Sequence, residues 1–92
     1  MTRIIVKQLV WEKWTVVHIG KHNVSTLEVN TAIQNLIAYK RGHSGRYILI
    51  GRSGHRLIST IVRRTKSNTY AVITARDSDK KERRIVYEKQ KK

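Results

Sequence analysis

The sequence contains no cysteine, few acidic residues and no long apolar run. Without cysteine it has neither a disulfide framework nor a thiolate metal site, and such a chain suits a reducing interior. No apolar stretch approaches the length of a transmembrane helix, and the apolar core of residues 1–8 is too short for a signal peptide. We therefore expect a cytoplasmic protein that does not bind membranes.

What is missing also excludes several enzyme classes. Six Asp and Glu residues are too few for paired-carboxylate catalysis, and no Ser-His-Asp or Cys-His arrangement is visible. The five glycines form neither a dinucleotide fingerprint nor a P-loop, and residues 51–54 are typical of a hairpin turn instead. Hydrolases of these types are not expected, and neither is a cofactor.

Positive charge is the dominant feature of what is present. The chain has 20 Lys and Arg residues and a formal net charge of +14. Residues 1–76 hold thirteen of these bases and only two acids, so the body of the protein, and not just a tail, is cationic. Because such a body repels itself unless it meets a polyanion, nucleic acid is the first candidate partner and an acidic protein the second.

The first half of the chain predicts one short strand and two helices. Residues 3–10 have the composition of a strand, and residues 11–22 have a helical repeat that ends where Asn23 suits a left-handed cap. A second helix is expected to begin at once, because Ser25 and Glu28 have capping-box spacing before an apolar stripe.

The stripe of this second helix covers residues 29–37, and a loop is expected over residues 40–45. Three strands then follow at residues 46–52, 57–64 and 70–76. Short links between them predict an antiparallel meander, and a weakly docked last helix is expected to begin near Lys80 and to fray over residues 89–92. The order predicts one α+β domain over residues 1–92, with helices packed on an antiparallel sheet.

His18 and His22 have the spacing of a helical zinc pair. The residues between them include no glutamate that could serve as the base of a metalloprotease, and no third ligand is evident. We therefore expect no metal. His22, at the helix end beside Lys21, is either a capping side chain or part of an electropositive groove.

Residues 69–83 form a β-run that ends at Arg76 and enters a basic helix. Asp79 and Glu82 have capping-box spacing, so Arg76 lies near the partial positive end of the helix, where a phosphate is favoured over another cation. Two interpretations of Arg76 remain open, a structural ion pair with Glu82 and a contact with RNA.

Arg46, Arg63 and Arg64 also lie at the ends of predicted strands. The ordinary interpretation of such charges is a solvated rim. Against it, the two acids of residues 1–76 cannot neutralise thirteen bases, so most of these arginines lack an intramolecular partner. Arg63 and Arg64 are adjacent in one strand and should point to opposite faces.

Several segments, taken in order, carry a resemblance to a known family. They are Val10-Trp11-Glu12, Lys21-His22 followed by Val24, Arg46-Tyr47, Ile50-Gly51, Ile73-Thr74-Ala75-Arg76, Lys81-Glu82-Arg83-Arg84 and Tyr87. With them the chain resembles, over nearly its whole length, the BrnT family of toxin–antitoxin ribonucleases, whose fold is similar to that of RelE. The block that begins at Ile73 is the most specific.

The resemblance implies a metal-independent endoribonuclease that cleaves mRNA through the RNA's own 2′-hydroxyl, inhibits translation and is neutralised by a cognate antitoxin. Proton transfer would fall to His22, and the reacting phosphate would be stabilised by Arg46 and Arg76. The remaining RNA-binding residues would be Lys21, Arg63, Arg64, Arg83 and Tyr87. We expect these side chains to converge at one concave spot beside the turn into the last helix.

Other functions fit the same charge. A non-catalytic RNA- or ribosome-binding module is the main alternative, because charge alone does not separate a binder from a nuclease. A DNA-binding regulator fits less well, since the two predicted helices are followed by strands and not by a recognition helix. Dependence on the ribosome, and a homodimer inside a toxin–antitoxin complex, are left open by the sequence.

Overall fold

The structure, a computed structural model, describes residues 4–42 and 44–90. They form an α+β fold, as predicted from the sequence. The elements are β1 (Gln8–Val10), α1 (Lys13–Gly20), α2 (Thr26–Gln34), β2 (Leu36–Arg41), β3 (Arg46–Ser53), β4 (Arg56–Lys66), β5 (Thr69–Asp77) and α3 (Lys80–Gln90). The strands form one sheet in the order β1-β5-β4-β3-β2, antiparallel except that β1 runs parallel to β5. The expected meander of β3, β4 and β5 is confirmed.

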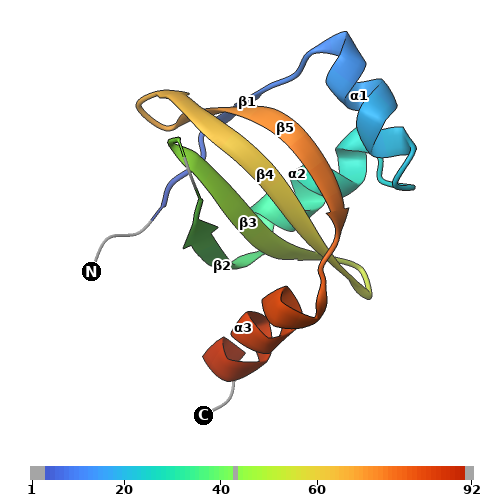
Figure 1. Cartoon of the computed structure of the whole chain (residues 1–92), viewed down its shortest axis with the longest axis vertical. Helices are drawn as coiled ribbons and strands as arrows, with labels where there is room; N and C mark the ends of the chain where they lie inside the picture. Colours follow the sequence, from blue (N-terminus) through green and yellow to red (C-terminus); the bar gives the residue numbers. More distant parts are fainter. Residues whose placement is uncertain (1–3, 43, 91–92) are drawn as a thin grey trace.

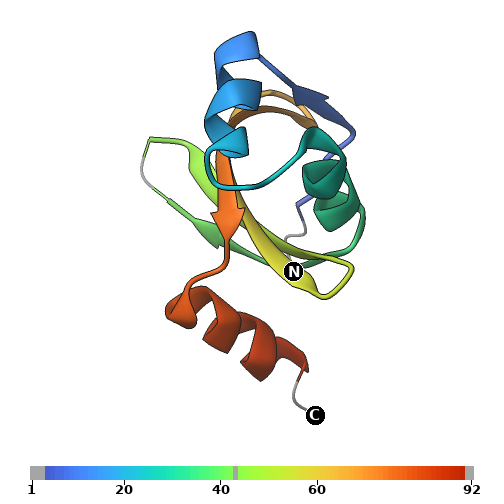
Figure 2. The same ribbon diagram turned by 90° about the vertical axis from the view of Figure 1, so that its right-hand side faces the viewer.

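The two N-terminal helices cover one face of the curved sheet, and α3 lies apart from them at its lower end (Figures 1 and 2). The core between these helices and the sheet consists of Ile19, Val24, Val29, Ala32, Ile58 and Ala75. A second buried cluster within the curve of the sheet consists of Leu49, Val62, Tyr70 and Val72. None of the described helices is long and apolar enough to cross a membrane.

Close packing of α2 on β3 depends on the absence of a side chain at position 51. A Cβ on Gly51 would lie 1.8 Å from the carbonyl oxygen of Ala32, well inside van der Waals contact. Gly51 lies within β3 and is not part of the turn. The hairpin turn that residues 51–54 predict is present at Gly54 and His55, between the paired residues Ser53 and Arg56.

The predicted link between α1 and α2 is confirmed in detail. Asn23 has a φ of 59°, and the N–H groups of Asn23 and Val24 donate to the carbonyls of Gly20 and Ile19, which is a Schellman cap. Ser25 and Glu28 then form the reciprocal hydrogen bonds of a capping box. The two caps fix a sharp turn between the helices.

The structure corrects several predicted boundaries. Leu36 and Ile37, assigned to a helical stripe, lie in β2, which also takes up residues 40 and 41 of the expected loop. α2 ends at Gln34 because the chain gains a ladder of hydrogen bonds to β3 by turning into a strand. Of the strand expected over residues 3–10, only β1 is present, and residue 3 lies outside the described residues.

The last helix is anchored more firmly than its apolar residues predict. Val86 is buried, and so is Glu82, for which the sequence left a structural ion pair with Arg76 as one of two interpretations. Lys89 and Gln90, expected to fray, belong to α3, while residues 91–92 lie outside the described part.

Candidate functional site

The junction between β5 and α3 is held by a network around the Glu82 carboxylate, which lies in a residue only 4% exposed. Arg76 donates from both terminal nitrogens to its two oxygens, at 2.7 and 2.8 Å. The Ser59 hydroxyl and the Asp79 N–H donate to the same carboxylate at 2.8 and 2.9 Å. The Glu82 N–H donates in turn to Asp79, which confirms the predicted capping box.

Of the two interpretations of Arg76, the structure contains the ion pair with Glu82. Burial alone would raise the pKa of Glu82, but hydrogen bonds from Arg76, the Asp79 backbone and Ser59 together outweigh it and lower that pKa. The hydrogen bond to Glu82 raises the pKa of Arg76. The Arg76 side chain is 34% exposed, so it also reaches solvent.

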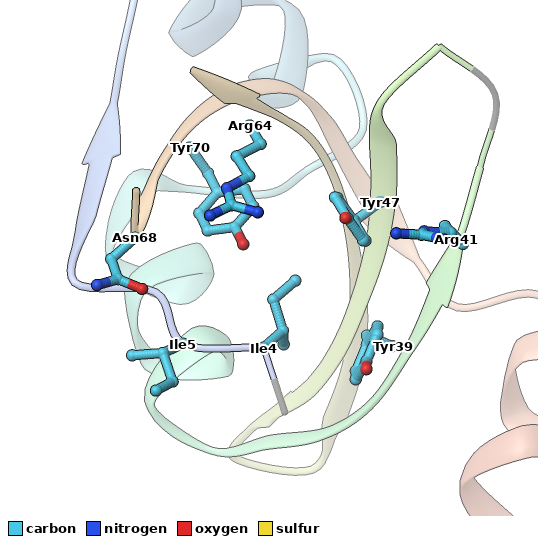
Figure 3. A pocket seen from close by; sticks show the side chains of 8 residues that line it. All are labelled: Ile4, Ile5, Tyr39, Arg41, Tyr47, Arg64, Asn68 and Tyr70. Carbon is cyan, nitrogen blue, oxygen red and sulfur yellow. The ribbon is translucent and has the colours of Figure 1, made fainter. Parts of the chain in front are cut away.

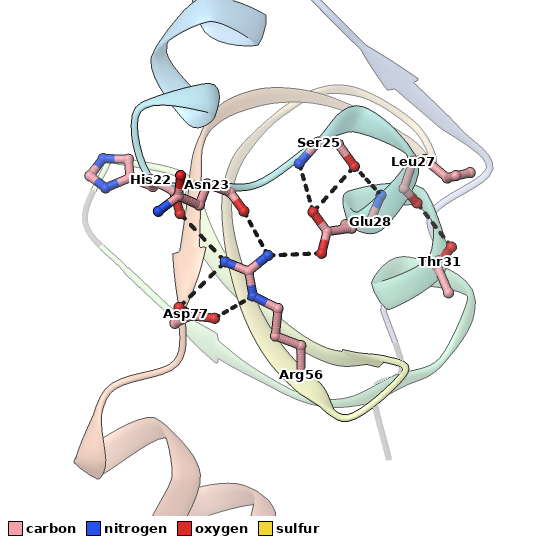
Figure 4. Close-up of polar contacts among 8 residues, drawn as sticks. All are labelled: His22, Asn23, Ser25, Leu27, Glu28, Thr31, Arg56 and Asp77. Carbon is pink, nitrogen blue, oxygen red and sulfur yellow. Dashed lines mark hydrogen bonds and ion pairs between the residues drawn. The ribbon is translucent and has the colours of Figure 1, made fainter.

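A second network is centred on Arg56, at the start of β4 (Figure 4). Its guanidinium donates to the carboxylates of Asp77 and Glu28, at 2.7 and 2.8 Å, and to the carbonyl oxygens of Asn23 and His22, at 2.6 and 3.4 Å. The pKa of Asp77 is lowered mainly by the hydrogen bond from Arg56. The pKa of Glu28 is lowered mainly by the hydrogen bond from the Ser25 backbone N–H within the capping box, and next by the hydrogen bond from Arg56. Arg56 therefore ties the α1–α2 link to the end of β5.

A cavity of about 290 Å³ lies beside this network. Its lining residues, which define what we call the turn cavity, are Arg52, His55, Arg56, Leu57, Asp77 and Arg83. In the described part of the chain, neither Arg52 nor Arg83 has a carboxylate within ion-pairing distance. Since Arg56 already engages Asp77, the charges left over at the turn cavity are positive, which suits a phosphate group.

Four of the predicted residues lie near this end of β5. The His22 carbonyl accepts a hydrogen bond from Arg56, while its imidazole points away from that guanidinium (Figure 4). Arg83 lines the turn cavity, and Arg76 directly precedes Asp77 in β5. Lys21 adjoins His22 at the end of α1 and is exposed.

Arg46 is not part of this group. It pairs with Arg63 across β3 and β4, whereas Arg76 pairs with Ser59. Because Ser59 and Arg63 are four residues apart, the Arg46–Arg63 pair lies roughly 13 Å along the strand from Arg76. All three arginines point to one sheet face, but this separation along the strand does not favour the expectation that Arg46 and Arg76 stabilise the same phosphate.

Arg64 and Tyr87, the other predicted residues, lie away from the end of β5. Arg64 points to the opposite face from Arg63, as expected, and lines a separate cavity with its cross-strand partner Tyr70. Tyr87 is 67% exposed on α3, one turn after Arg83. Arg63 and Arg64 therefore lie on opposite faces of the sheet, and the predicted RNA-binding residues do not all converge at one spot.

The rings of His18 and His22 lie edge to face, with centroids 5.2 Å apart. Residues 4–42 and 44–90 contain no group of three or more His, Cys, Asp or Glu side chains that could hold a metal ion, with or without these two histidines. Trp14 also contacts His18, with ring centroids 6.4 Å apart, so the two histidines belong to a row of rings along α1.

Sequence reasoning missed Arg52, His55 and Arg56 as site residues. It treated residues 51–54 as a hairpin turn, whereas Arg52 and Arg56 are paired strand residues and the turn consists of Gly54 and His55. The available signal was charge, because Arg52 and Arg56 flank the two-residue turn that contains His55, and the turn brings all three to one end of the sheet.

Neither a protein-family model nor a curated protein sequence matches the chain. Among solved structures, the crystal structure of the Brucella abortus ribonuclease toxin BrnT matches it with a TM-score of 0.62 at 18% sequence identity. The match covers 79% of this chain and 97% of BrnT. This chain has the BrnT fold. At such an identity the likeness to BrnT establishes the architecture, and the chemistry must be argued from the residues at the end of β5.

Proposed function

We propose that this single domain is the toxin of a toxin–antitoxin pair and an endoribonuclease that cleaves mRNA. The observation that carries the proposal is the turn cavity, where Arg52 and Arg83 have no carboxylate within ion-pairing distance in the described chain. His22 and Arg76 do not line this cavity, but His22 contacts Arg56 through its carbonyl and Arg76 directly precedes the lining residue Asp77. The BrnT fold supports it, because the structural neighbour is a ribonuclease toxin.

The proposed reaction needs no metal, since the RNA supplies its own nucleophile. The 2′-oxygen attacks the adjacent phosphorus while the bond from phosphorus to the 5′-oxygen breaks, which leaves a 2′,3′-cyclic phosphate and a 5′-hydroxyl. The 2′-hydroxyl loses one proton and the leaving 5′-oxygen gains one; His22 transfers one of them and solvent water the other, while Arg76 and Arg83 stabilise the charge that develops on the phosphorane. DNA lacks the 2′-hydroxyl and is spared.

The remaining cations hold the strand in line for attack. We assign Arg46 to this role together with Arg63, because the pair lies on the sheet face that Arg76 shares but at a distance from it. Lys21 binds backbone beside His22, and Tyr87 stacks a base or donates a proton.

Neutralisation by an antitoxin follows from the same charge. A cognate antitoxin should be acidic at least where it covers this surface, since matched charges lower the cost of masking it. We place the pair in the cytoplasm, where mRNA is the substrate. We further propose that the protein acts on mRNA at the ribosome and that it forms a homodimer within the toxin–antitoxin complex.

The alternative is a module that binds RNA or the ribosome without cutting it. The bidentate pair between Arg76 and Glu82 favours this alternative, because it uses a cation that catalysis would need. The two functions differ in their products. Incubation with single-stranded RNA in the presence of a chelator should yield 2′,3′-cyclic phosphate ends, and RNA substituted with 2′-O-methyl groups should stay intact. Binding without any cleavage would support the alternative.

A further inference from the structure

A second and larger cavity, of about 440 Å³, lies in the mouth of the curled sheet (Figure 3). Its lining residues, which define what we call the mouth pocket, are Ile4, Ile5, Tyr39, Arg41, Tyr47, Arg64, Asn68 and Tyr70. They come from the segment before β1 and from β2, β3, β4 and the turn into β5, so the pocket lies between the two edges of the sheet. Its volume falls in the range of small-molecule sites.

Aromatic rings form one wall of the mouth pocket. Tyr47 contacts Tyr70 edge to face, with centroids 6.0 Å apart and planes at 84°, and it also contacts Tyr39, at 6.4 Å. Tyr70 is 4% exposed, and its hydroxyl points toward the centre of the pocket (Figure 3). Three tilted rings give a ligand flat apolar surfaces together with hydroxyl groups.

The rim of the pocket is positively charged. Arg41 lies over the Tyr47 ring, with Cζ 6.0 Å from its centroid, and Arg64 is the cross-strand partner of Tyr70 (Figure 3). The eight lining residues include no acid, and within the described chain neither arginine has a carboxylate within ion-pairing distance. The rim therefore attracts an anion that can approach the rings.

We propose that the mouth pocket binds one unpaired nucleotide of single-stranded RNA, with its base on the tyrosine wall and its phosphate at Arg41 and Arg64. This inference rests on the proposed RNA-directed function and adds a recognition site on the sheet face opposite to Arg46 and Arg63. Stacking of an exposed base on aromatic rings, with an arginine at the phosphate, is how proteins hold unpaired RNA.

An acidic peptide is the competing occupant of a basic pocket. The nucleotide is favoured because three of the eight lining residues are tyrosines, whose rings match a planar base better than a peptide chain, while Ile4 and Ile5 complete the apolar part of the lining. Asn68 also lines the pocket, and its amide adds a group that can donate and accept hydrogen bonds (Figure 3).

The test is a calorimetric or NMR titration with AMP and UMP, with ribose 5-phosphate as the ligand without a base. The variants are Tyr47→Leu, which keeps an apolar side chain, and Arg41→Gln at the exposed rim. Lys40→Gln is the matched control, because it removes one charge from the neighbouring residue on the other sheet face. Both pocket variants should weaken nucleotide binding at least about fivefold and the control less than about twofold.

The source of the nucleotide is tested by competition with a fully 2′-O-methylated RNA strand, which cannot be cleaved. Displacement of the bound mononucleotide by this strand is the expected result, and its failure would overturn the assignment to RNA. Equal binding of ribose 5-phosphate and AMP, or binding of an acidic peptide in place of nucleotides, would also overturn the proposal. Because no cleavage is measured, these results are independent of whether the protein is a nuclease.

Discussion

Glu82 is the single residue on which the geometry of the β5–α3 junction most depends. Its carboxylate joins β4, β5 and the first turn of α3 through hydrogen bonds with Ser59, Arg76 and Asp79. Glu82→Ala should destabilise the protein by about 2–4 kcal/mol, because it leaves buried donors without an acceptor. Urea unfolding measures this change. Glu88→Ala, on the exposed side of the same helix, should change stability by less than about 0.5 kcal/mol.

Substitutions of Arg76 can distinguish a catalytic role of this residue from a structural one. Arg76→Ala should lower RNA cleavage at least about tenfold, the effect of losing one charge-assisted contact in the transition state. It also leaves the buried Glu82 carboxylate unpaired, which lowers stability. The double variant Arg76→Ala/Glu82→Gln removes that charge. Cleavage should stay low in the double variant, and recovery to the original rate would show that Arg76 only holds the junction.

At the residue scale, the sequence predicted local caps well and distant partners poorly. Asn23, the Ser25–Glu28 box and the Asp79–Glu82 box are set by neighbours within four residues, so spacing alone identified them. The contacts of Arg56 with Glu28 and Asp77 join residues 28 and 21 positions apart. No local pattern encodes such a separation, which is why the Arg56 network and the turn cavity were missed.

At the scale of elements, the contact between α2 and β3 depends on a missing side chain. Gly51→Ala places a methyl group against the Ala32 carbonyl, so α2 must shift, at a cost of at least about 2 kcal/mol. Gly20→Ala is the matched control, since nothing lies within 4 Å of its added Cβ and alanine suits a helix better. Thermal unfolding should show a lower midpoint for the first variant and no loss for the second.

The β2 strand shows why the fold could be predicted only in part. Residues 36–39 are a short apolar run that fits a helix or a strand equally well, and the preceding stripe favoured the helix. These residues form a strand because they pair with β3, and such pairing depends on a tertiary partner that the periodicity of the sequence does not reveal. The three strands of the meander were predictable because short turns place each beside its partner.

At the scale of the whole molecule, three carboxylates make stability depend on pH. The folded protein lowers the pKa values of Glu28, Asp77 and Glu82, so it binds protons less tightly than the unfolded chain. Their stabilisation is present above the ordinary values of 4.5 and 3.8 and is lost as pH falls through the lowered ones. Urea midpoints should be constant above a pH of about 5 and fall below it. Glu82→Gln should flatten this dependence, and an unchanged slope would contradict the assignment.

The net charge of +14 explains attraction to RNA but not where cleavage occurs, so the central claim concerns the end of β5. The most direct measurement is the rate of 2′,3′-cyclic phosphate formation from single-stranded RNA, in chelator, by the original protein and three folded variants. His22→Ala and Arg83→Ala should each slow the reaction at least about tenfold, while Lys66→Ala, at the other end of β4, should change it less than about twofold. Equal losses in all three variants, or no cyclic phosphate from the original protein, would contradict the account.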